Sequence, residues 1–510
     1  MLRAAVARVL RAPVSFFDTT PLGRITNRFS KDVDTMDNNL SDSLLNFLLF
    51  SSQIVAVFIL TIVYFPYFAV ALAVLAILVL FSVRYYRSSA RELKRHEALL
   101  RSHVFTRFGK AISGVSTIRA YGLQQRFTAL VNSAVDDMDG AYFLTFANQC
   151  WLSTRLDAAG NAMVLAVGIL VVTSRLSINP SISGLLLSSM VSVVKYLQYS
   201  VRQLAEVENN MNSAERLHHY AASIEQEAAF CTAGVPPTWP EWGEIVFDDV
   251  HMRYRRGLPD VLHGLNICIR PGERMGIVGR TGAGKSSILS TLFRLVELSH
   301  GTIIIDGMNI AKIGLHDLRS RLSIIPQDPT LFQGTIRSNL DPFNKHTDLE
   351  LWYALRQADL VADDQGINGI GGQHVHLDTS IEEAGADFSL GQRQMIALAR
   401  ALVRNSPIIV CDEATSAVDF KTDRRIQEAI MRGSKGKTLL CIAHRLRTIL
   451  GYDRICVMDA GKIVELDTPL ALWDQGGIFR SMCDRSGIAR QDLIDNQDKA
   501  DSTGGKSRDG

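Results

Sequence analysis

The sequence predicts a chain of two unlike parts, a bundle of membrane-spanning α-helices followed by an α/β domain. The first observation is a stretch without any charged residue from Ser43 to Val83. The second is the alternation of short β-rich runs with amphipathic helical patterns beyond Glu241, which is typical of α/β domains. The third is the mean hydropathy of +0.10, which is high for a soluble protein and low for a purely membrane-embedded one.

The composition excludes several classes of protein. The 510 residues include 54 Lys and Arg and 52 Asp and Glu, so the net charge of +2 gives no field that would attract nucleic acid. Charged residues make up 21% and apolar residues 47%, which excludes disordered and collagen-like chains. The seven cysteines form no CxxC pair, and we expect them to be free thiols in a reducing compartment.

Four membrane spans are expected. A helix rises about 1.5 Å per residue and crosses a core of about 30 Å in about 20 residues, so the charge-free stretch is long enough for two spans. Pro66 marks the turn between them, and two later apolar stretches carry isolated charges. The four expected spans are residues 44–65, 67–86, 141–172 and 182–204.

The two later spans contain charged residues, and charges within a span usually face the interior of a helix bundle or a water-filled cavity. Lys195 and Arg202 either line a pore or extend to the membrane interface, and the sequence leaves both interpretations open. Arg155 and Asp157 lie two positions apart on different faces of a helix, so we do not expect them to form an ion pair.

The flanking charges and the composition predict the orientation and the domain boundaries. The N-terminal segment and the connection that begins at Arg84 are rich in Arg and Lys, so both should lie in the cytoplasm. Four spans then return the chain to the cytosol. The expected segments are a membrane part over 1–221, a Pro-containing linker over 222–241, an α/β domain over 242–486 and a disordered polar tail over 487–510.

A glycine-rich loop gives the α/β domain its chemistry. The buried strand Met275–Val278 leads into residues 279–287 and then into a helical run, which is the context that a phosphate-binding P-loop requires. Its glycines let backbone N–H groups approach phosphate, Lys285 can reach the outer phosphates and Ser286 can ligate Mg²⁺. The predicted nucleotide-binding residues of the loop are Gly279, Arg280, Thr281, Gly282, Ala283, Gly284, Lys285, Ser286 and Ser287.

Polar residues follow three other predicted strands, and the carboxyl ends of parallel strands meet at one edge of a sheet. Asp412 ends an apolar strand and can hold Mg²⁺, while Glu413 can polarise the attacking water. Without the P-loop, this pair would be interpreted as a solvated strand end. Gln327 is suited to Mg²⁺ or water, and His444 is a plausible γ-phosphate sensor, although a lone histidine would more often be structural.

Tyr254 precedes two arginines and can stack on an adenine ring. Its alternative interpretation is an ordinary aromatic residue of a strand. The P-loop and the strand ends together predict ATP and Mg²⁺ as the cofactors of this domain.

The segment Phe388-Ser-Leu-Gly-Gln392, followed by Arg393-Gln394, resembles the signature sequence of ATP-binding cassette (ABC) proteins. This resemblance implies a P-loop NTPase domain with an ABC β-subdomain and an α-helical signature subdomain. It also implies that Gln327, residues 416–419 and His444 are the Q-loop, the D-loop and the switch histidine. The implied contacts in trans, to the P-loop of a second cassette, come from Ser389, Gly391 and Gln392.

Two longer segments narrow the resemblance. Residues 15–34 and 326–343 resemble the second half of subfamily C, the multidrug-resistance-associated transporters, and the fungal oligomycin-resistance type. In exporters of this kind (type I, also termed type IV), the first segment is a cytoplasmic coupling loop that follows the second helix, and residues 109–122 lie near the second coupling helix. The four spans would then be helices three to six, which predicts an N-terminally truncated C-terminal half.

The resemblance implies the function of an ATP-hydrolysing half of a membrane exporter for amphipathic or anionic small molecules, in the plasma membrane or the vacuolar membrane. A second ABC half is the implied partner, together with the lipid bilayer and the substrate. Leu390 replaces the second glycine of the common signature, while Glu413 suggests the competent half of an asymmetric pair. An ATP-gated channel and a non-transporting regulatory subunit are the alternatives, whereas the charge-free stretch excludes soluble cassette ATPases of DNA repair.

Overall fold

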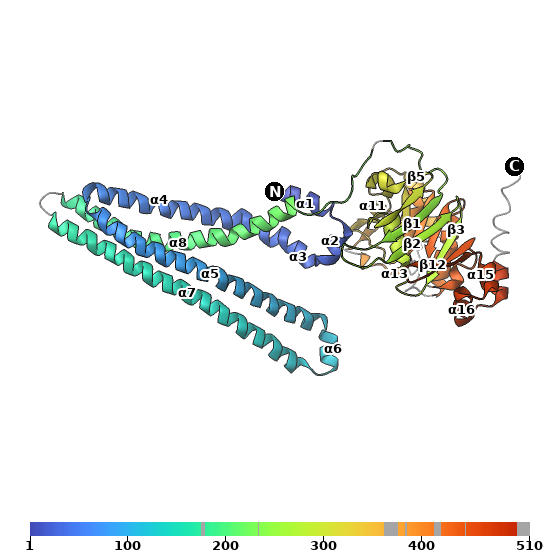
Figure 1. Ribbon diagram of the computed structural model, residues 1–510, viewed down its shortest axis with the longest axis horizontal. Helices are drawn as coiled ribbons and strands as arrows, with labels where there is room; N and C mark the ends of the chain where they lie inside the picture. Colours follow the sequence, from blue (N-terminus) through green and yellow to red (C-terminus); the bar gives the residue numbers. More distant parts are fainter. Residues whose placement is uncertain are drawn as a thin grey trace. The chain divides into compact units, whose positions relative to one another are not determined.

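The computed structural model describes residues 1–174, 179–232, 234–361, 376–382, 385–412, 420–443 and 445–496 (Figure 1). The chain forms two compact units. The first, here the helical unit, comprises Met1–Leu10 and Pro21–Ile224, and the second, here the α/β unit, comprises Arg11–Thr20 and Glu225–Gly510.

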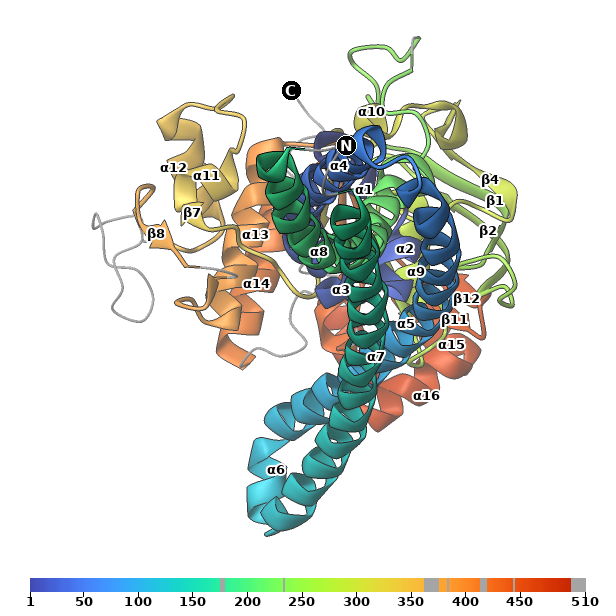
Figure 2. The same ribbon diagram turned by 90° about the vertical axis from the view of Figure 1, so that its left-hand side faces the viewer.

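Long helices make up the helical unit, and four of those in the described part of the chain are long and apolar enough to cross a membrane. These four overlap the four expected spans, and each extends beyond its span at one end or at both. Helices α5 and α7 run side by side and are joined at their far end by α6 (Figures 1 and 2). The elements are α1 (Leu2–Val9), α3 (Leu22–Asn27), the π-helical turns η1 (Arg28–Asp32) and η2 (Thr35–Asn39), α4 (Leu40–Tyr64), α5 (Phe68–Ser113), α6 (Val115–Ala120), α7 (Gln124–Thr173) and α8 (Pro180–Ala222).

Helices α7 and α8 approach each other closely at Gly160. A Cβ atom at this position would lie 2.7 Å from Cγ2 of Val194, so only glycine allows the contact. Near it, Asp157 of α7 accepts a hydrogen bond from Gln198 of α8, while the guanidinium of Arg155 lies 5.6 Å from the centre of the Trp151 ring. The two charged residues thus have separate partners.

Arg202 lines a polar cavity of about 380 Å³ within the helical unit. Asp42 of α4 and Glu206 of α8 line the same cavity, so the cation at this position is accompanied by two carboxylates. Lys195, in contrast, is exposed on α8.

Within its described residues, the α/β unit contains two large β-sheets and a short antiparallel pair of strands, β7 and β8. The larger has the order β12-β11-β3-β10-β9-β6 and is parallel except for β12, and the smaller is antiparallel with the order β2-β1-β4-β5. Because both faces of the parallel sheet are covered, strands such as β10 are buried at every position. The strands are β1 (Ile245–Met252), β2 (Leu262–Ile269), β3 (Arg274–Gly279), β4 (His300–Ile305), β5 (Met308–Asn309), β6 (Leu322–Ile325), β7 (Gly334–Thr335), β8 (Ser380–Ile381), β9 (Ile408–Asp412), β10 (Thr438–Ile442), β11 (Arg454–Asp459) and β12 (Lys462–Asp467).

Helices surround the larger sheet. Figure 2 shows the smaller sheet and the helices α11 and α12 at opposite sides of this unit. The helices are α2 (Val14–Thr19), α9 (Lys285–Leu292), the 3₁₀ turn η3 (Ile310–Lys312), α10 (Leu315–Arg319), α11 (Ile336–Leu340), α12 (Asp348–Gln357), α13 (Leu390–Arg404), α14 (Phe420–Gly433), the 3₁₀ turn η5 (Leu446–Thr448), α15 (Pro469–Gln475) and α16 (Ile478–Arg485).

Candidate functional site

The parallel register brings the predicted site residues to one edge of the larger sheet. Ile442 of β10 pairs with Ile277 of β3 on one side and with Asp412 of β9 on the other. Ile325 of β6 pairs with Cys411, so the segments that follow β3, β9 and β6 leave the sheet at neighbouring positions. This edge, at the carboxyl ends of the strands, is where parallel α/β sheets bind ligands.

The P-loop has the backbone geometry that its glycines allow. Gly282 and Gly284 have φ values of +83° and +92°, a region that side chains other than glycine rarely enter. A Cβ atom at Gly279 would lie 2.2 Å from the carbonyl oxygen of Met458, so the paired strand β11 can approach this closely only because the residue is glycine. The loop leads directly into α9, whose N-terminal N–H groups favour an anion.

Lys285 and Ser286 are the first two residues of α9. The Lys285 side chain is 5% exposed, and its Nζ donates to the carbonyl oxygens of Gly279 at 2.8 Å and Arg280 at 3.2 Å. Ser286 Oγ lies 3.4 Å from Asp412 Oδ1, although 126 positions separate the two residues in the sequence. The Ser286 hydroxyl thus lies beside the carboxylate that ends β9, and the loop carbonyls hold the buried ammonium group of the preceding residue.

These two oxygen donors suit Mg²⁺, a hard cation that is often held by one or two protein oxygens together with substrate phosphates. Within the described residues, no group of three or more His, Cys, Asp and Glu side chains is arranged to hold a metal ion.

Tyr254 is tied to the helix that carries the P-loop. Its hydroxyl lies 2.8 Å from Ser287 Oγ, and the residue is 38% exposed, so part of the ring is free to stack on a base. Strand β1 ends at Met252, so Tyr254 is not a residue of that strand, and its hydroxyl contacts a residue next to the P-loop.

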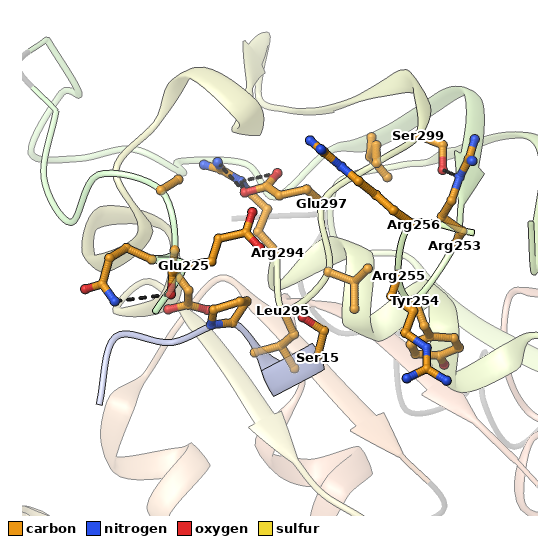
Figure 3. A pocket seen from close by; sticks show the side chains of 16 residues that line it. Ser15, Glu225, Arg253, Tyr254, Arg255, Arg256, Arg294, Leu295, Glu297 and Ser299 are labelled. Carbon is orange, nitrogen blue, oxygen red and sulfur yellow. Dashed lines mark hydrogen bonds and ion pairs between the residues drawn. The ribbon is translucent and has the colours of Figure 1, made fainter. Parts of the chain in front are cut away.

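A cavity of about 1170 Å³ begins at Tyr254 and extends to the segment that follows α9 (Figure 3). Glu225, Arg294 and Glu297 lie toward one side of this view, and Arg253, Tyr254 and Ser299 lie toward the other. The residues that line it are Pro13, Ser15, Glu225, Gln226, Glu227, Ala228, Arg253, Tyr254, Arg255, Arg256, Arg294, Leu295, Val296, Glu297, Leu298 and Ser299.

The signature residues form the N-terminus of α13. Ser389 Oγ accepts a hydrogen bond from the backbone N–H of Gln392, and Gln392 Oε1 accepts one from the N–H of Ser389, which is a capping box. Gly391 is buried in the first turn. The capped end of this helix of 15 residues is a suitable place for a phosphate.

Gln327 is exposed after β6, and its carbonyl oxygen lies 3.5 Å from Nε2 of Gln394 in α13. A second contact between α13 and a distant segment was not predicted from the sequence. Arg400 of α13 donates to the backbone and side-chain oxygens of Asn339 at 2.8 and 3.0 Å, and burial lowers the pKa of Arg400. Its only signal in the sequence was a cation within the apolar run of residues 395–403.

Two predicted catalytic residues, Glu413 and His444, lie outside the described residues, as do residues 416–419. The structure does describe the residues next to Glu413 and His444 in the sequence, Asp412 and Arg445. Asp412 ends β9 at the P-loop, and Arg445 Nη1 donates to Oδ2 of the buried Asp423 at 2.7 Å.

Two family models match the chain, the ABC transporter transmembrane region over residues 1–194 and the ABC transporter model over residues 262–416. The chain belongs to the ABC transporter family. Its α/β unit is an ABC ATPase domain, and the four long helices make it a multi-pass membrane protein.

Similar proteins support this assignment. The chain is 60% identical to the ABC-type transporter cicA of Emericella nidulans, over 98% of this chain and 37% of that protein. It is 46% identical to the oligomycin resistance ATP-dependent permease YOR1 of Saccharomyces cerevisiae, over 96% and 34%. It is 41% identical to ATP-binding cassette sub-family C member 2 of Mus musculus, over 95% and 31%, which confirms the resemblance to subfamily C.

The chain therefore spans about a third of the length of these relatives. Among solved structures, it is similar to a bacterial Atm1-family ABC exporter with ATP bound, with a TM-score of 0.80 and 25% identity, over 96% of this chain and 84% of that one. The fold predicted from the sequence, membrane helices followed by an ABC ATPase domain, is confirmed.

Proposed function

We propose that this chain is the ATP-hydrolysing half of a membrane exporter that moves amphipathic or anionic small molecules. The observation that carries the proposal is the meeting of Lys285, Ser286 and Asp412 at the end of a parallel sheet, in a chain with four membrane-length helices. Its relatives include an oligomycin resistance permease and the multidrug resistance protein fer6 of Mycosarcoma maydis, and these names support a small molecule as the exported substrate.

In this proposal, the residues position a nucleotide and stabilise developing charge, which is most of what phosphoryl transfer requires. The P-loop backbone and Lys285 hold the phosphates, and Tyr254 stacks on the adenine. Ser286, Asp412 and Gln327 are the residues that would hold Mg²⁺, which would neutralise charge on the outer phosphates. Glu413 orients the attacking water, and His444 contacts the γ-phosphate.

In this proposal, a second ABC half completes the exporter and its ATP-binding sites. Ser389, Gly391 and Gln392 would donate to the P-loop of that half, and its signature would cover the nucleotide bound here. The share of the relatives that this chain spans leaves room for such a half in the same protein or in a partner chain.

The proposal is tested with the chain purified together with a matching ABC half and reconstituted in vesicles. We expect ATP hydrolysis that depends on Mg²⁺ and uptake of an amphipathic anion that depends on hydrolysis. Glu413→Gln should remove both activities and leave ATP binding intact. Hydrolysis at the normal rate in this variant would refute the assignment of Glu413, and an ATP-gated current without uptake would indicate a channel instead.

A further inference from the structure

The segment that follows α8 is bound to the α/β unit by backbone hydrogen bonds. The N–H of Leu315 donates to the carbonyl of Ala229 at 3.0 Å, and the N–H of His316 donates to that of Phe230 at 2.8 Å. The rings of Phe230 and His316 stack, with centres 4.8 Å apart and an interplanar angle of 20°. We call residues 225–232 the docked linker, because these contacts fix it against α10 in a single register.

Gly314 makes this close approach possible. A Cβ atom at Gly314 would lie 2.6 Å from the Cα of Cys231 and 2.7 Å from the carbonyl oxygen of Phe230. Both are backbone atoms of the docked linker, so no side-chain movement could relieve the clash. Any larger residue at position 314 would displace the linker.

The strongest contact of the docked linker is an ion pair between Glu227 and Arg319. The two guanidinium nitrogens Nη1 and Nη2 donate to the two carboxylate oxygens at 2.9 and 2.7 Å, and the side chains are 20% and 28% exposed. A bidentate pair of this kind is geometrically specific as well as strong.

Arg319 also holds the C-terminal end of α9. Its Nε donates to the carbonyl of Phe293 at 3.0 Å, and Nη2 donates to that of Arg294 at 2.7 Å. A cation is favoured at this end of a helix, where carbonyl groups lack partners. The same guanidinium therefore bridges the docked linker and the helix that begins with Lys285.

The bridge is stiff at the α9 end. Arg294 is 7% exposed, has a φ of +47° and donates to the carbonyls of Ile310 and Ile313 at 2.9 and 2.7 Å. Helix α9 has eight residues, about 12 Å of rigid rod between the P-loop and this point. Arg294, Glu225 and Glu297 all line the cavity in Figure 3, and Arg294 forms an ion pair with Glu297 there.

We propose that the Glu227–Arg319 pair is a coupling latch. Movement of α9 on nucleotide binding is passed through Arg319 to the docked linker, which continues the chain from α8. This gives ATP a covalent route to the membrane helices besides the cytoplasmic loops. The inference rests on the proposed function, since it requires that the P-loop binds ATP.

The test measures alkylation of Cys231, an exposed thiol at the end of the docked linker, with and without Mg²⁺ and ATP. The other exposed thiols, Cys150 and Cys268, are replaced by serine. We expect ATP to change the alkylation rate in the parent chain, and Glu227→Gln to reduce this response about tenfold, the loss typical of one charged hydrogen-bonded pair. The matched control is Glu241→Gln, at an exposed position outside the docked linker and the cavity, which should respond like the parent.

An ATP response in Glu227→Gln equal to that of the parent would overturn the latch, provided that ATP binding, measured separately, is equal in both. If the parent does not bind ATP, the proposed function fails, and the coupling latch is then tested by the alkylation rates of Cys231 measured without nucleotide. Gly314→Ala and Glu227→Gln should then still raise the alkylation rate because the linker detaches. Rates equal to that of the parent would overturn the latch in that case as well.

Discussion

Replacement of Lys285 by methionine should weaken nucleotide binding far more than it weakens the fold. Methionine keeps the unbranched stem of the 5%-exposed side chain but removes the ammonium that lies 2.8 and 3.2 Å from two loop carbonyls. A hydrogen bond to a charged group contributes about 1.5–3 kcal/mol, so the loss of one bond to phosphate should weaken binding by about 1.5–3 kcal/mol. At about 1.4 kcal/mol for each factor of ten, the Kd for ATP should rise about 10- to 140-fold.

The assay is the change in fluorescence anisotropy of a labelled ATP on titration with the purified chain, with circular dichroism to verify the fold. Lys462→Met, at an exposed position that opens β12, is the matched control and should leave the Kd unchanged. A Kd for Lys285→Met close to that of the parent, in a folded chain, would refute the reasoning. An equal loss in Lys462→Met would also refute it, because the effect would then be one of net charge.

Three further outcomes are expected. Tyr254→Ala should raise the Kd for ATP about 5- to 150-fold, since stacking on a base contributes about 1–3 kcal/mol. Tyr254→Phe keeps the ring and should bind ATP almost as the parent does. An equal rise of the Kd in both variants would indicate that the hydroxyl, and not the ring, binds the nucleotide. Phe479→Ala should lower the free energy of unfolding by about 3–5 kcal/mol in urea titrations, because this ring of α16 is fully buried; a loss near zero would contradict that packing. Burial raises the pKa of Cys456 to about 12, so the native state keeps a proton that the unfolded chain loses above a pH of about 8.5. The free energy of unfolding should therefore fall as the pH rises from there. Cys456→Ala should show a smaller fall, and an identical slope would contradict the raised pKa.

The P-loop and the membrane spans could be predicted because their signals are local. The glycines of residues 279–287 and the charge-free stretch each specify a structure within a few turns of chain. The helix ends were less accessible, since α5 continues to Ser113, far beyond the apolar run. Hydropathy indicates where a helix leaves the lipid. It does not indicate where the helix itself ends, because polar residues can continue the helix in water.

Contacts between distant segments could not be predicted in the same way. The sequence identified Ser286 and Asp412 separately, but only the pairing of β9 with β10 and of β10 with β3 shows that they are neighbours. The prolines of residues 236–240 predicted a linker, while the attachment of its first part depends on Gly314 and Arg319, some ninety positions away. Such contacts arise from tertiary packing, which no single-segment pattern encodes.

The most direct test of nucleotide binding at the strand ends is photolabelling of the purified chain with 8-azido-ATP, followed by peptide mapping. An azide on the adenine reports the residues next to the base. We predict label on the peptide that contains Tyr254, lost in the presence of excess ATP and in Lys285→Met. Label confined to other peptides, or label at Tyr254 that excess ATP does not displace, would contradict the account.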